Sequence, residues 1–329
     1  MRTAPEGLDE RNLAGCLLRG WRVRLVRAEH VPVGGGSYHW RADDSAGRCH
    51  WVTADDLDRK PFLGETREAS FEGLRRALEA ARALRRSGLE FVVAPVPTSE
   101  GGVVLRLGPR YAVALYPFLE GSTFRFGELL PPAEHGELAG MLARLHRATP
   151  DVIGVARPAG PLVPERDGLE QALGDLGSTW AGGPFSEPAR ALLARHARGI
   201  RRLLTTFDGL VDEVMAERSE PVLTHGEPHP GNLLAARGRL HLVDWDTAAL
   251  APPERDLWLL DAGSGDGLAR YAEASGRQPG PAALRLYRLR WQLEDISVFL
   301  RVLRSPHRQT ADTEHAWRSL QRSMPAGDA

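Results

Sequence analysis

The residues best suited to chemistry lie in LTHGEPHPGNLL, residues 223–234, and in HLVDWDT, residues 241–247. The first segment carries a carboxylate, Glu227, and an amide, Asn232, and the second carries Asp244 at the end of a strand-like run. A carboxylate can orient a hydroxyl and take its proton, and amide and carboxylate oxygens are ligands that Mg²⁺ accepts. Transfer of a phosphoryl group to a hydroxyl needs these functions and little covalent chemistry. The spacing therefore predicts Glu227 as the base and Asn232 and Asp244 as metal ligands, with Asp246 nearby to assist.

The same loop also contains H-x-E and H-x-x-x-H patterns, which raise the alternative of a zinc site. A zinc deaminase would need P-C-x-x-C and a zinc protease H-E-x-x-H, and the sequence contains neither. Two prolines in the loop disfavour the helix that would align His225 with His229. We therefore expect His225 to be a structural residue that packs the loop. His229 is expected either to face the substrate or to be solvated.

Apolar periodicity and turn residues predict the elements that must position this loop. The first 120 residues or so indicate a small sheet with one long helix, at about 66–87, which Gly88 ends. Strand-like runs follow at 91–98, 101–108 and 110–121. After Pro131 the pattern becomes helical. Helices are expected at about 133–149, 167–177, 187–217, 255–275 and 281–304, with a loop at 151–166.

Charge and composition argue against several classes of protein. The chain has 329 residues, 42 basic and 43 acidic side chains and a net charge of −1, which gives no support to binding of nucleic acid. No run approaches the ~18 apolar residues of a membrane span. Cys16 and Cys49 form no C-x-x-C motif, which fits a reducing compartment. We expect a cytoplasmic protein that acts on a small molecule, with neither nucleic acid nor membrane as partner.

Taken together in order, these motifs resemble the aminoglycoside phosphotransferase family, which shares its fold with other small-molecule kinases. The family loop H-G-D-x-x-x-x-N matches residues 225–232 except at Glu227, and the metal strand matches residues 243–245. Asp256-Leu257 and Leu145-His146-Arg147 match two further family motifs, so the resemblance covers about residues 20–305. It implies an α+β, two-lobed protein-kinase-like fold. The expected parts are a small antiparallel-sheet lobe with one long helix (1–116), a hinge (117–121) and a larger, mainly helical lobe (122–329).

The resemblance also implies ATP and Mg²⁺ as cofactors and assigns further residues. Asp256 is expected to bond the backbone of the catalytic loop. The hinge and the glycine-rich turn are expected to hold the nucleotide through Gly34, Gly36, Ser37, Thr53, Tyr116 and Phe118. Acidic residues on a late helix often face cationic substrates in this family. The expected substrate contacts are His229, Asp246, Glu294 and Asp295, although the last two equally fit a solvated helix face.

Two positions depart from the family pattern. The lysine that usually ends the second strand and holds the phosphates is replaced by Thr53, so its usual pair with a glutamate of the long helix, Glu72 or Glu79, cannot form. Lys60 is the only lysine of the chain and can be considered as a substitute, as can an arginine of the same lobe. The second departure is Glu227, which is one methylene longer than the aspartate expected there. A shift of about 1 Å can cost about 100-fold in rate.

The sequence therefore predicts an ATP-dependent phosphotransferase that acts on a hydroxyl of a small molecule, with an aminoglycoside or aminocyclitol antibiotic as the first candidate. A sugar or amino alcohol remains open as acceptor. A nucleotide-binding pseudokinase is the alternative of another class, because Thr53 and Glu227 both stand at catalytic positions. Nucleotidyl transfer is a further alternative.

Overall fold

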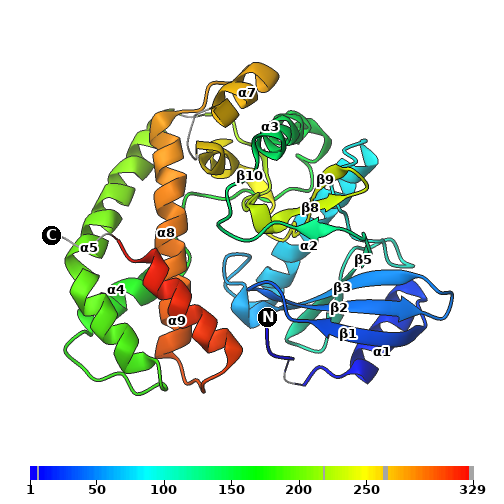
Figure 1. Cartoon of the computed structure of the whole chain (residues 1–329), viewed down its shortest axis with the longest axis horizontal. Helices are drawn as coiled ribbons and strands as arrows, with labels where there is room; N and C mark the ends of the chain where they lie inside the picture. The colour runs from blue at the N-terminus through cyan, green and yellow to red at the C-terminus, as the bar shows by residue number, and fades with distance from the viewer. Residues whose placement is uncertain (6, 218, 262–265, 326–329) are drawn as a thin grey trace. The chain divides into compact units, whose positions relative to one another are not determined.

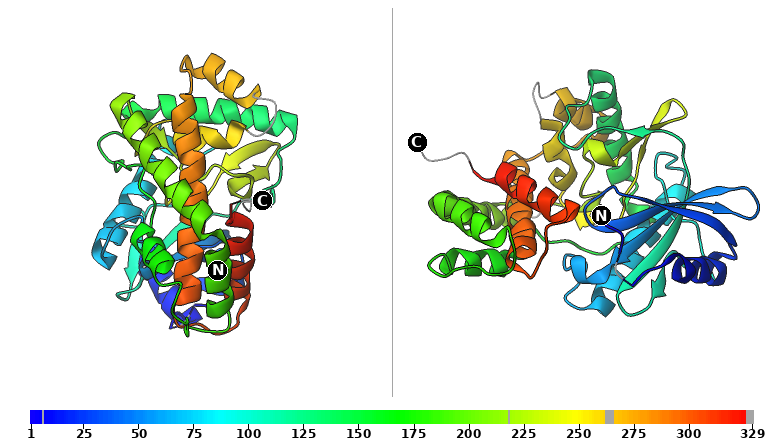
Figure 2. Two further views of the ribbon diagram at one scale, coloured as in Figure 1. Left: turned by 90° about the vertical axis from the view of Figure 1, so that its left-hand side faces the viewer. Right: turned by 60° about the horizontal axis from the view of Figure 1, so that its bottom comes forward.

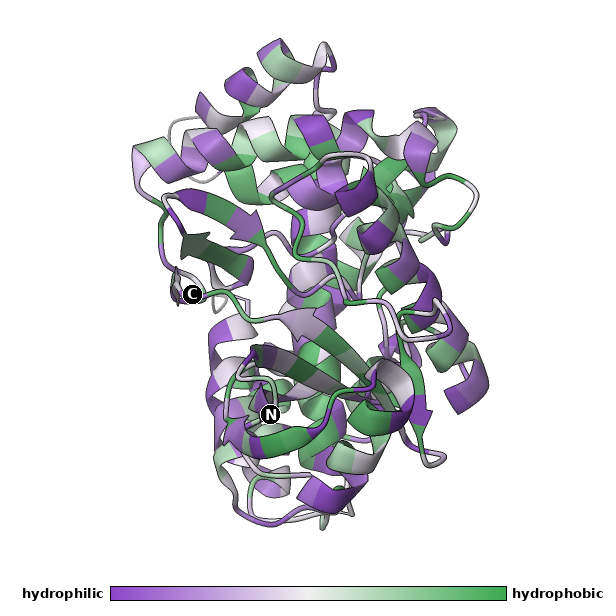
Figure 3. Cartoon of the chain, turned by 90° about the vertical axis from the view of Figure 1, so that its right-hand side faces the viewer, coloured by the Kyte–Doolittle hydropathy of each residue, from purple (hydrophilic) through white to green (hydrophobic). Residues whose placement is uncertain are grey.

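The computed structural model describes residues 1–5, 7–217, 219–261 and 266–325. The chain divides into two compact units (Figure 1). The first combines Met1–Ala159 with Glu220–Pro279, and the second combines Gly160–Ser219 with Gly280–Ala329. Hydrophobic residues alternate with hydrophilic ones along the helices (Figure 3), as expected for elements that bury one face.

A five-stranded antiparallel sheet begins the first unit, in the order β1-β2-β3-β5-β4. The strands are β1 (Leu25–Val31), β2 (Ser37–Asp44), β3 (Cys49–Asp56), β4 (Leu105–Leu107) and β5 (Tyr111–Pro117). Thr53 stands in register with His39 on β2 and Ala114 on β5. Because side chains alternate along a strand, Tyr38 and Trp40 join one core face while His39 and Thr53 face the opposite side. This confirms the predicted antiparallel sheet.

Two helices accompany this sheet. Helix α2 (Arg67–Arg86), capped by Thr66, agrees with the predicted long helix. Helix α1 (Glu10–Trp21) was not predicted, so the expectation of a single helix beside the sheet was wrong. Its buried residues Leu13 and Leu17 pack into the same core as Trp40 of the sheet, and its position against the sheet is visible in Figure 2. The signal for α1 was local, since Asp9 and Asn12 form a reciprocal capping box.

The remainder of the first unit carries short strands and helices that surround the predicted catalytic loop. β7 (Val222–Thr224) pairs with β10 (Ala249–Ala251), and β8 (Leu233–Ala236) lies between β6 (Ser122–Thr123) and β9 (Arg239–Leu242). The helices are α3 (Pro132–Arg147), α6 (Glu254–Leu257) and α7 (Asp266–Ser275), with short 3₁₀ turns at Leu57–Arg59, Thr149–Asp151, Pro230–Asn232 and Trp258–Asp261.

Two predicted elements of this unit differ in the structure. Residues 91–98 form no strand, because their hydrogen bonds are divided between two sheets. Val92 forms an isolated bridge with Leu242 of β9, and Val96 donates one hydrogen bond to Leu115 of β5 at 2.7 Å. The single helix expected over 255–275 is divided into α6, a 3₁₀ turn and α7, and residues 262–265 lie outside the described part.

The second unit is built from four described helices. They are α4 (Arg166–Gly174), α5 (Ser186–Glu217), α8 (Pro281–Arg304) and α9 (Ala311–Ser323), and α8 contacts the other three. Their shared core includes Leu193, Phe207, Leu293 and Leu320. The first three of these helices were predicted. Helix α9 was missed although Thr310 and Thr313 form a capping box at its start.

Among the described helices, we find none with the length and apolar character needed to cross a membrane.

Candidate active site

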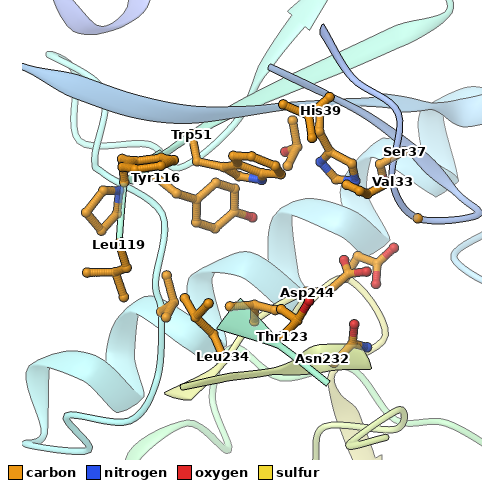
Figure 4. Close-up of a pocket in the computed structure, with 18 of the residues that line it drawn as sticks. Val33, Ser37, His39, Trp51, Tyr116, Leu119, Thr123, Asn232, Leu234 and Asp244 are labelled. Atoms are coloured by element: carbon orange, nitrogen blue, oxygen red, sulfur yellow. The ribbon is translucent and has the colours of Figure 1, made fainter. Parts of the chain in front are cut away.

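A cavity of about 490 Å³ lies in the first unit, between the sheet and the loops that follow β7 and β9. Figure 4 shows Trp51 and Tyr116 projecting from the sheet toward Thr123 and Leu234. Figure 4 shows Ser37, His39, Asn232 and Asp244 at the other end of the same cavity. Asp55, which bonds Ser37, and Asp246 also line it. One wall is therefore suited to a flat apolar group and the opposite end to cations and their anionic partners.

The loop after β7 is held from beneath by Asp256 of α6. One carboxylate oxygen accepts the backbone N–H of His225 at 2.8 Å, and the other accepts that of Gly226 at 2.6 Å. Gly226 has a φ of +98°, and a Cβ at this position would overlap the Arg255 guanidinium. Asp256 itself is fully buried and bonds His146 of α3 at 3.1 Å. The loop backbone is therefore fixed by a carboxylate at a position where only glycine fits.

His225 connects the same loop to the strand that carries the predicted metal ligand. Its Nε2 lies 2.9 Å from the carbonyl of Val243, and its Nδ1 accepts the backbone N–H of Glu227 at 3.2 Å. These two contacts require the tautomer protonated on Nε2. Burial lowers the pKa of His225, which keeps the ring neutral. His225 is buried and touches only backbone through its nitrogens, which suits a positioning residue.

Glu227, the predicted base, lies at the surface of the loop. Its carboxylate is 3.9 Å from Nε2 of His229, and its side chain is about one-third exposed. Burial lowers the pKa of His229 to about 4, so this neighbour is neutral at pH 7. The ring of Phe126 meets His229 edge-on with centroids 4.9 Å apart. Glu227 does not line the cavity itself, so an acceptor would have to approach it from beside Phe126 and His229.

Asn232 and Asp244 both line the polar end of the cavity (Figure 4). The amide Nδ2 of Asn232 donates to the carbonyl of Glu227 at 3.0 Å, which leaves the amide oxygen to face a ligand. Asp244 has a φ of +64°, a conformation that is rare for a residue with a side chain and concentrates at functional sites. Burial, and next the charge of Asp246, raises the pKa of Asp244 to about 7. A bound cation would relieve both penalties, so these two residues fit a divalent metal.

The described residues contain no group of three or more His, Cys, Asp or Glu side chains arranged to hold a metal. Both ring nitrogens of His225 are committed to the loop contacts given above. A site with two protein oxygen ligands nevertheless suits Mg²⁺, which commonly completes its shell with water and phosphate oxygens.

Thr53 lines the cavity where the family pattern has lysine. The Lys60 ammonium approaches the same end of the cavity from the turn after β3. It lies 2.9 Å from a carboxylate oxygen of Asp55 and also contacts Asp246. Burial opposes its charge, but the carboxylates of Asp246 and Asp55 raise the pKa of Lys60 well above its usual value.

Glu72 and Glu79 of α2 were the candidates for the partner of a strand lysine. The structure pairs both of them with Arg75 of their own helix, each at 2.6 Å. Sequence reasoning had kept Lys60 as one option and had not considered Asp55. The signal for Asp55 was its position two residues after Thr53, which places both side chains on one face of the strand.

The glycine-rich turn and the predicted hinge also lie near the cavity. Gly34 has a φ of +75° and lines it, as do Ser37, Tyr116 and Phe118. Ser37 donates its hydroxyl to Asp55 at 2.6 Å. Gly36 is not a lining residue. A Cβ built there would be 3.5 Å from the Lys60 ammonium, which places the turn over that group.

The predicted substrate contacts are found in different places. Asp246 lines the cavity and pairs with Lys60. Glu294 and Asp295 lie on α8 of the second unit. There Glu294 pairs with Arg290 at 2.8 Å, and Asp295 accepts a hydrogen bond from Ser323 at 3.2 Å.

Comparisons with known proteins identify relatives over most of the chain. The phosphotransferase enzyme family matches residues 51–289. Protein StrN from Streptomyces griseus is 30% identical over 324 residues, which cover 92% of this chain and 87% of StrN.

Solved structures share the fold. Spectinomycin phosphotransferase, APH(9)-Ia, in complex with ADP and spectinomycin has a TM-score of 0.75 at 19% identity and covers 96% of this chain and 95% of its own. Amicoumacin kinase hAmiN, in complex with AMP-PNP and Ca²⁺, has a TM-score of 0.60 at 13% identity, with 97% and 95% covered. Plasmodium vivax ethanolamine kinase has a TM-score of 0.56 at 11% identity, with 98% and 95% covered.

These kinase structures confirm the predicted α+β kinase-like fold, and the family match confirms the predicted class of enzyme. The chain belongs to the phosphotransferase enzyme family and is a small-molecule kinase.

Proposed function

We propose that this protein transfers the γ-phosphoryl group of ATP to a hydroxyl of a small molecule with Mg²⁺ as cofactor. The observation that carries the proposal is the cavity itself, in which an apolar aromatic wall and a set of oxygen ligands occupy opposite ends. A nucleotide has the same division, with a flat base at one end and phosphates at the other. The complexes of related folds with ADP and with AMP-PNP and Ca²⁺ support a nucleotide and a divalent ion here.

The nucleotide base would lie against Trp51 and Tyr116, next to the connector that contains Phe118 and Leu119. Residues 117–121 then act as the hinge between a nucleotide-binding lobe (1–116) and the lobe from 122 onward. Gly34 and Ser37 would cover the phosphates, because a glycine-rich turn can bring backbone N–H groups close to anionic oxygens.

Mg²⁺ would be held by the amide oxygen of Asn232 and the carboxylate of Asp244, and it would neutralise charge on the phosphates. Glu227 would orient the acceptor hydroxyl and accept its proton. The acceptor oxygen forms a bond to the γ-phosphorus while the bond from that phosphorus to the β–γ bridging oxygen breaks, and ADP leaves with the electron pair. His225 and Asp256 hold the loop backbone, so the position of Glu227 is set before the acceptor arrives.

An aminocyclitol or aminoglycoside is the first candidate for the acceptor. Its support is the likeness of fold to the spectinomycin phosphotransferase and the negative charge of Glu227 on the acceptor side, which would attract a cationic compound. A sugar or an amino alcohol is the second candidate, for which the fold of the ethanolamine kinase gives support.

The test is turnover of ATP with Mg²⁺ against a panel of aminocyclitols, aminoglycosides, sugars and amino alcohols, with product masses measured. We expect one class to gain a phosphoryl group. A product mass that corresponds to the gain of a nucleotidyl group would show that the reaction is nucleotidyl transfer and not phosphoryl transfer. ATP binding with no modified product across the panel would favour the pseudokinase.

A further inference from the structure

Lys60 occupies an unusual position for a lysine. It is 1% exposed, and it is the only lysine in a chain with 42 basic residues. It follows the 3₁₀ turn Leu57–Arg59, just after β3. Its ammonium does not reach solvent and ends instead beneath the glycine-rich turn, next to Gly36. A surface role is therefore excluded.

Lys60 is not itself among the residues that line the cavity, but its ion-pair partners place its ammonium directly behind the polar end. Asp55 and Asp246, its two ion-pair partners, both line the cavity. The charge of Asp244, a proposed metal ligand, also acts on Lys60. An ammonium has three N–H donors. Two carboxylates pair with it and the Phe62 ring centroid lies 5.8 Å away, so a third donor can be taken by an incoming oxygen in place of the ring.

We propose that Lys60 is the cation that holds the phosphates of the bound nucleotide, entering the cavity from the chain after β3 instead of from position 53 on the strand. The proposal rests on the proposed function, because it needs a nucleotide in this cavity. Thr53 lies on the cavity wall and carries no charge. Lys60 supplies the missing positive charge from seven residues further along.

Asp55 then takes the part of the partner carboxylate. It receives the Ser37 hydroxyl at 2.6 Å and the Lys60 ammonium at 2.9 Å through the same oxygen, so it links the glycine-rich turn to the lysine. The glutamates of α2, Glu72 and Glu79, form ion pairs with Arg75 of the same helix. The cation and its carboxylate partner are thus both displaced from the positions that the family pattern predicts.

The competing interpretation is that Lys60 is only a structural ion pair between the sheet and the loop after β9. The two interpretations differ in which ligands respond to its loss. If Lys60 binds the phosphates, its loss weakens the binding of ATP and leaves the binding of adenosine unchanged, because adenosine has no phosphates. If Lys60 is only structural, its loss changes the shape of the whole cavity and weakens the binding of both ligands.

The experiment measures affinities of the full chain for Mg-ATP and for adenosine, without an acceptor, for K60M, K60R and the neighbouring control R59M. Arg59 is half-exposed and pairs with Asp56, outside the cavity. We expect K60M to weaken ATP binding by about 30- to 100-fold and to change adenosine binding by less than about twofold. K60R should lie between wild type and K60M, and R59M should match wild type. The double variant T53K/K60M should recover part of the ATP affinity, because it returns a lysine to the strand.

Equal losses for ATP and adenosine in K60M, or unchanged ATP affinity, would overturn the proposal. Melting temperatures of all variants show whether a loss of ATP affinity comes from unfolding. If K60M is unfolded, the ATP affinity of K60R is compared with that of R59M, and an affinity for K60R equal to that of R59M would contradict the proposal. The proposed function fails separately, if the wild-type chain binds no ATP.

The single lysine also permits a direct chemical test with an acyl phosphate of ATP. The Lys60 ammonium first gives one proton to a buffer base, and the amine that results attacks the acyl carbon. An amide forms, the acyl–oxygen bond to the phosphate breaks, ATP leaves and the second amine proton passes to water. We expect the acyl adduct to form at Lys60. Excess ATP should suppress its formation, and inorganic phosphate should leave it unchanged. A chain modified only at its terminal amine, or modification that ATP does not suppress, would contradict the assignment.

Discussion

The carboxylate of Asp256 accepts the backbone N–H of His225 at 2.8 Å across 31 residues of chain. The same carboxylate also holds Gly226 and bonds the buried His146. The shape of the proposed catalytic loop is therefore imposed by a fully buried group that cannot touch substrate. This relationship shows what fixes the backbone of a loop with two prolines and two glycines, and it leads to the first two predictions.

Asp256→Asn should lower both stability and activity. An amide cannot accept both backbone N–H groups and the His146 contact, so buried donors are left without partners, at about 2–4 kcal/mol. Urea unfolding should show this loss, and kcat should fall more than the affinity for ATP. Asp151→Asn, at an exposed position, is the control and should be close to wild type. Wild-type stability of Asp256→Asn would contradict the positioning role.

Gly226→Ala should destabilise the protein by about 2 kcal/mol or more, because positive φ and overlap with Arg255 both oppose a Cβ. Gly238→Ala provides a matched control. Gly238 has a φ of +70° but no atom within 4 Å of the added Cβ. Gly238→Ala should lower the free energy of unfolding by about 1 kcal/mol, through backbone strain alone. Equal losses for the two variants in thermal unfolding would show that Arg255 yields without cost.

Asp244→Ala should abolish turnover that depends on Mg²⁺, with a loss of about 1,000-fold or more in kcat. Its stability should be unchanged or higher, because the substitution removes a buried carboxylate that is repelled by Asp246. Activity assays and melting curves on the same preparation test the two effects together. A fall in stability that accounts for the lost activity would contradict the metal assignment.

Glu227→Gln should reduce kcat by about 100- to 10,000-fold with little change in nucleotide affinity, because it removes a base and leaves the cavity unaltered. Glu227 does not line the cavity, which is why nucleotide binding should be spared. Glu227→Asp tests the length of the side chain. If Glu227→Gln remained fully active on a true substrate, another group would have to accept the proton.

Asp295→Asn should stabilise the second unit in a way that depends on pH. Burial, and next the charge of Glu294, raises the pKa of Asp295 to about 7, above its usual value near 3.8. Because this pKa is higher in the folded than in the unfolded chain, ionisation of Asp295 lowers the free energy of unfolding. Below about pH 4 the carboxyl is protonated in both states and nothing is lost. The loss grows as pH rises from about 4 to about 7 and is constant above that. The variant should therefore match wild type at pH 4 and exceed it at pH 8 by up to about 4 kcal/mol, because each of the roughly three pKa units contributes about 1.4 kcal/mol. An equal gain at both pH values would mean that ionisation of Asp295 is not the cause.

Several features of this protein were open to prediction because they depend on neighbours in the sequence. The long helix α2 follows from an apolar stripe with Thr66 at its start, and the loop containing Glu227 and Asn232 follows from residue types at fixed spacing. Helices α1 and α9 also carried local capping signals, at Asp9 and Thr310, that were not used. The failure at residues 91–98 was of another kind, because an apolar run does not specify which sheet it will join.

The sequence by itself determined the family, the long helices α2, α5 and α8 and the positions of the two candidate loops, since these depend on residue type, order and spacing. Only the tertiary structure brought Lys60 to two carboxylates of the cavity lining and left Glu227 outside that lining. Lys60 and Asp246 are 186 residues apart, and their contact depends on how the turn after β3 and the loop after β9 approach each other. Pairing between side chains so distant in the chain is set by packing, and no local pattern encodes it.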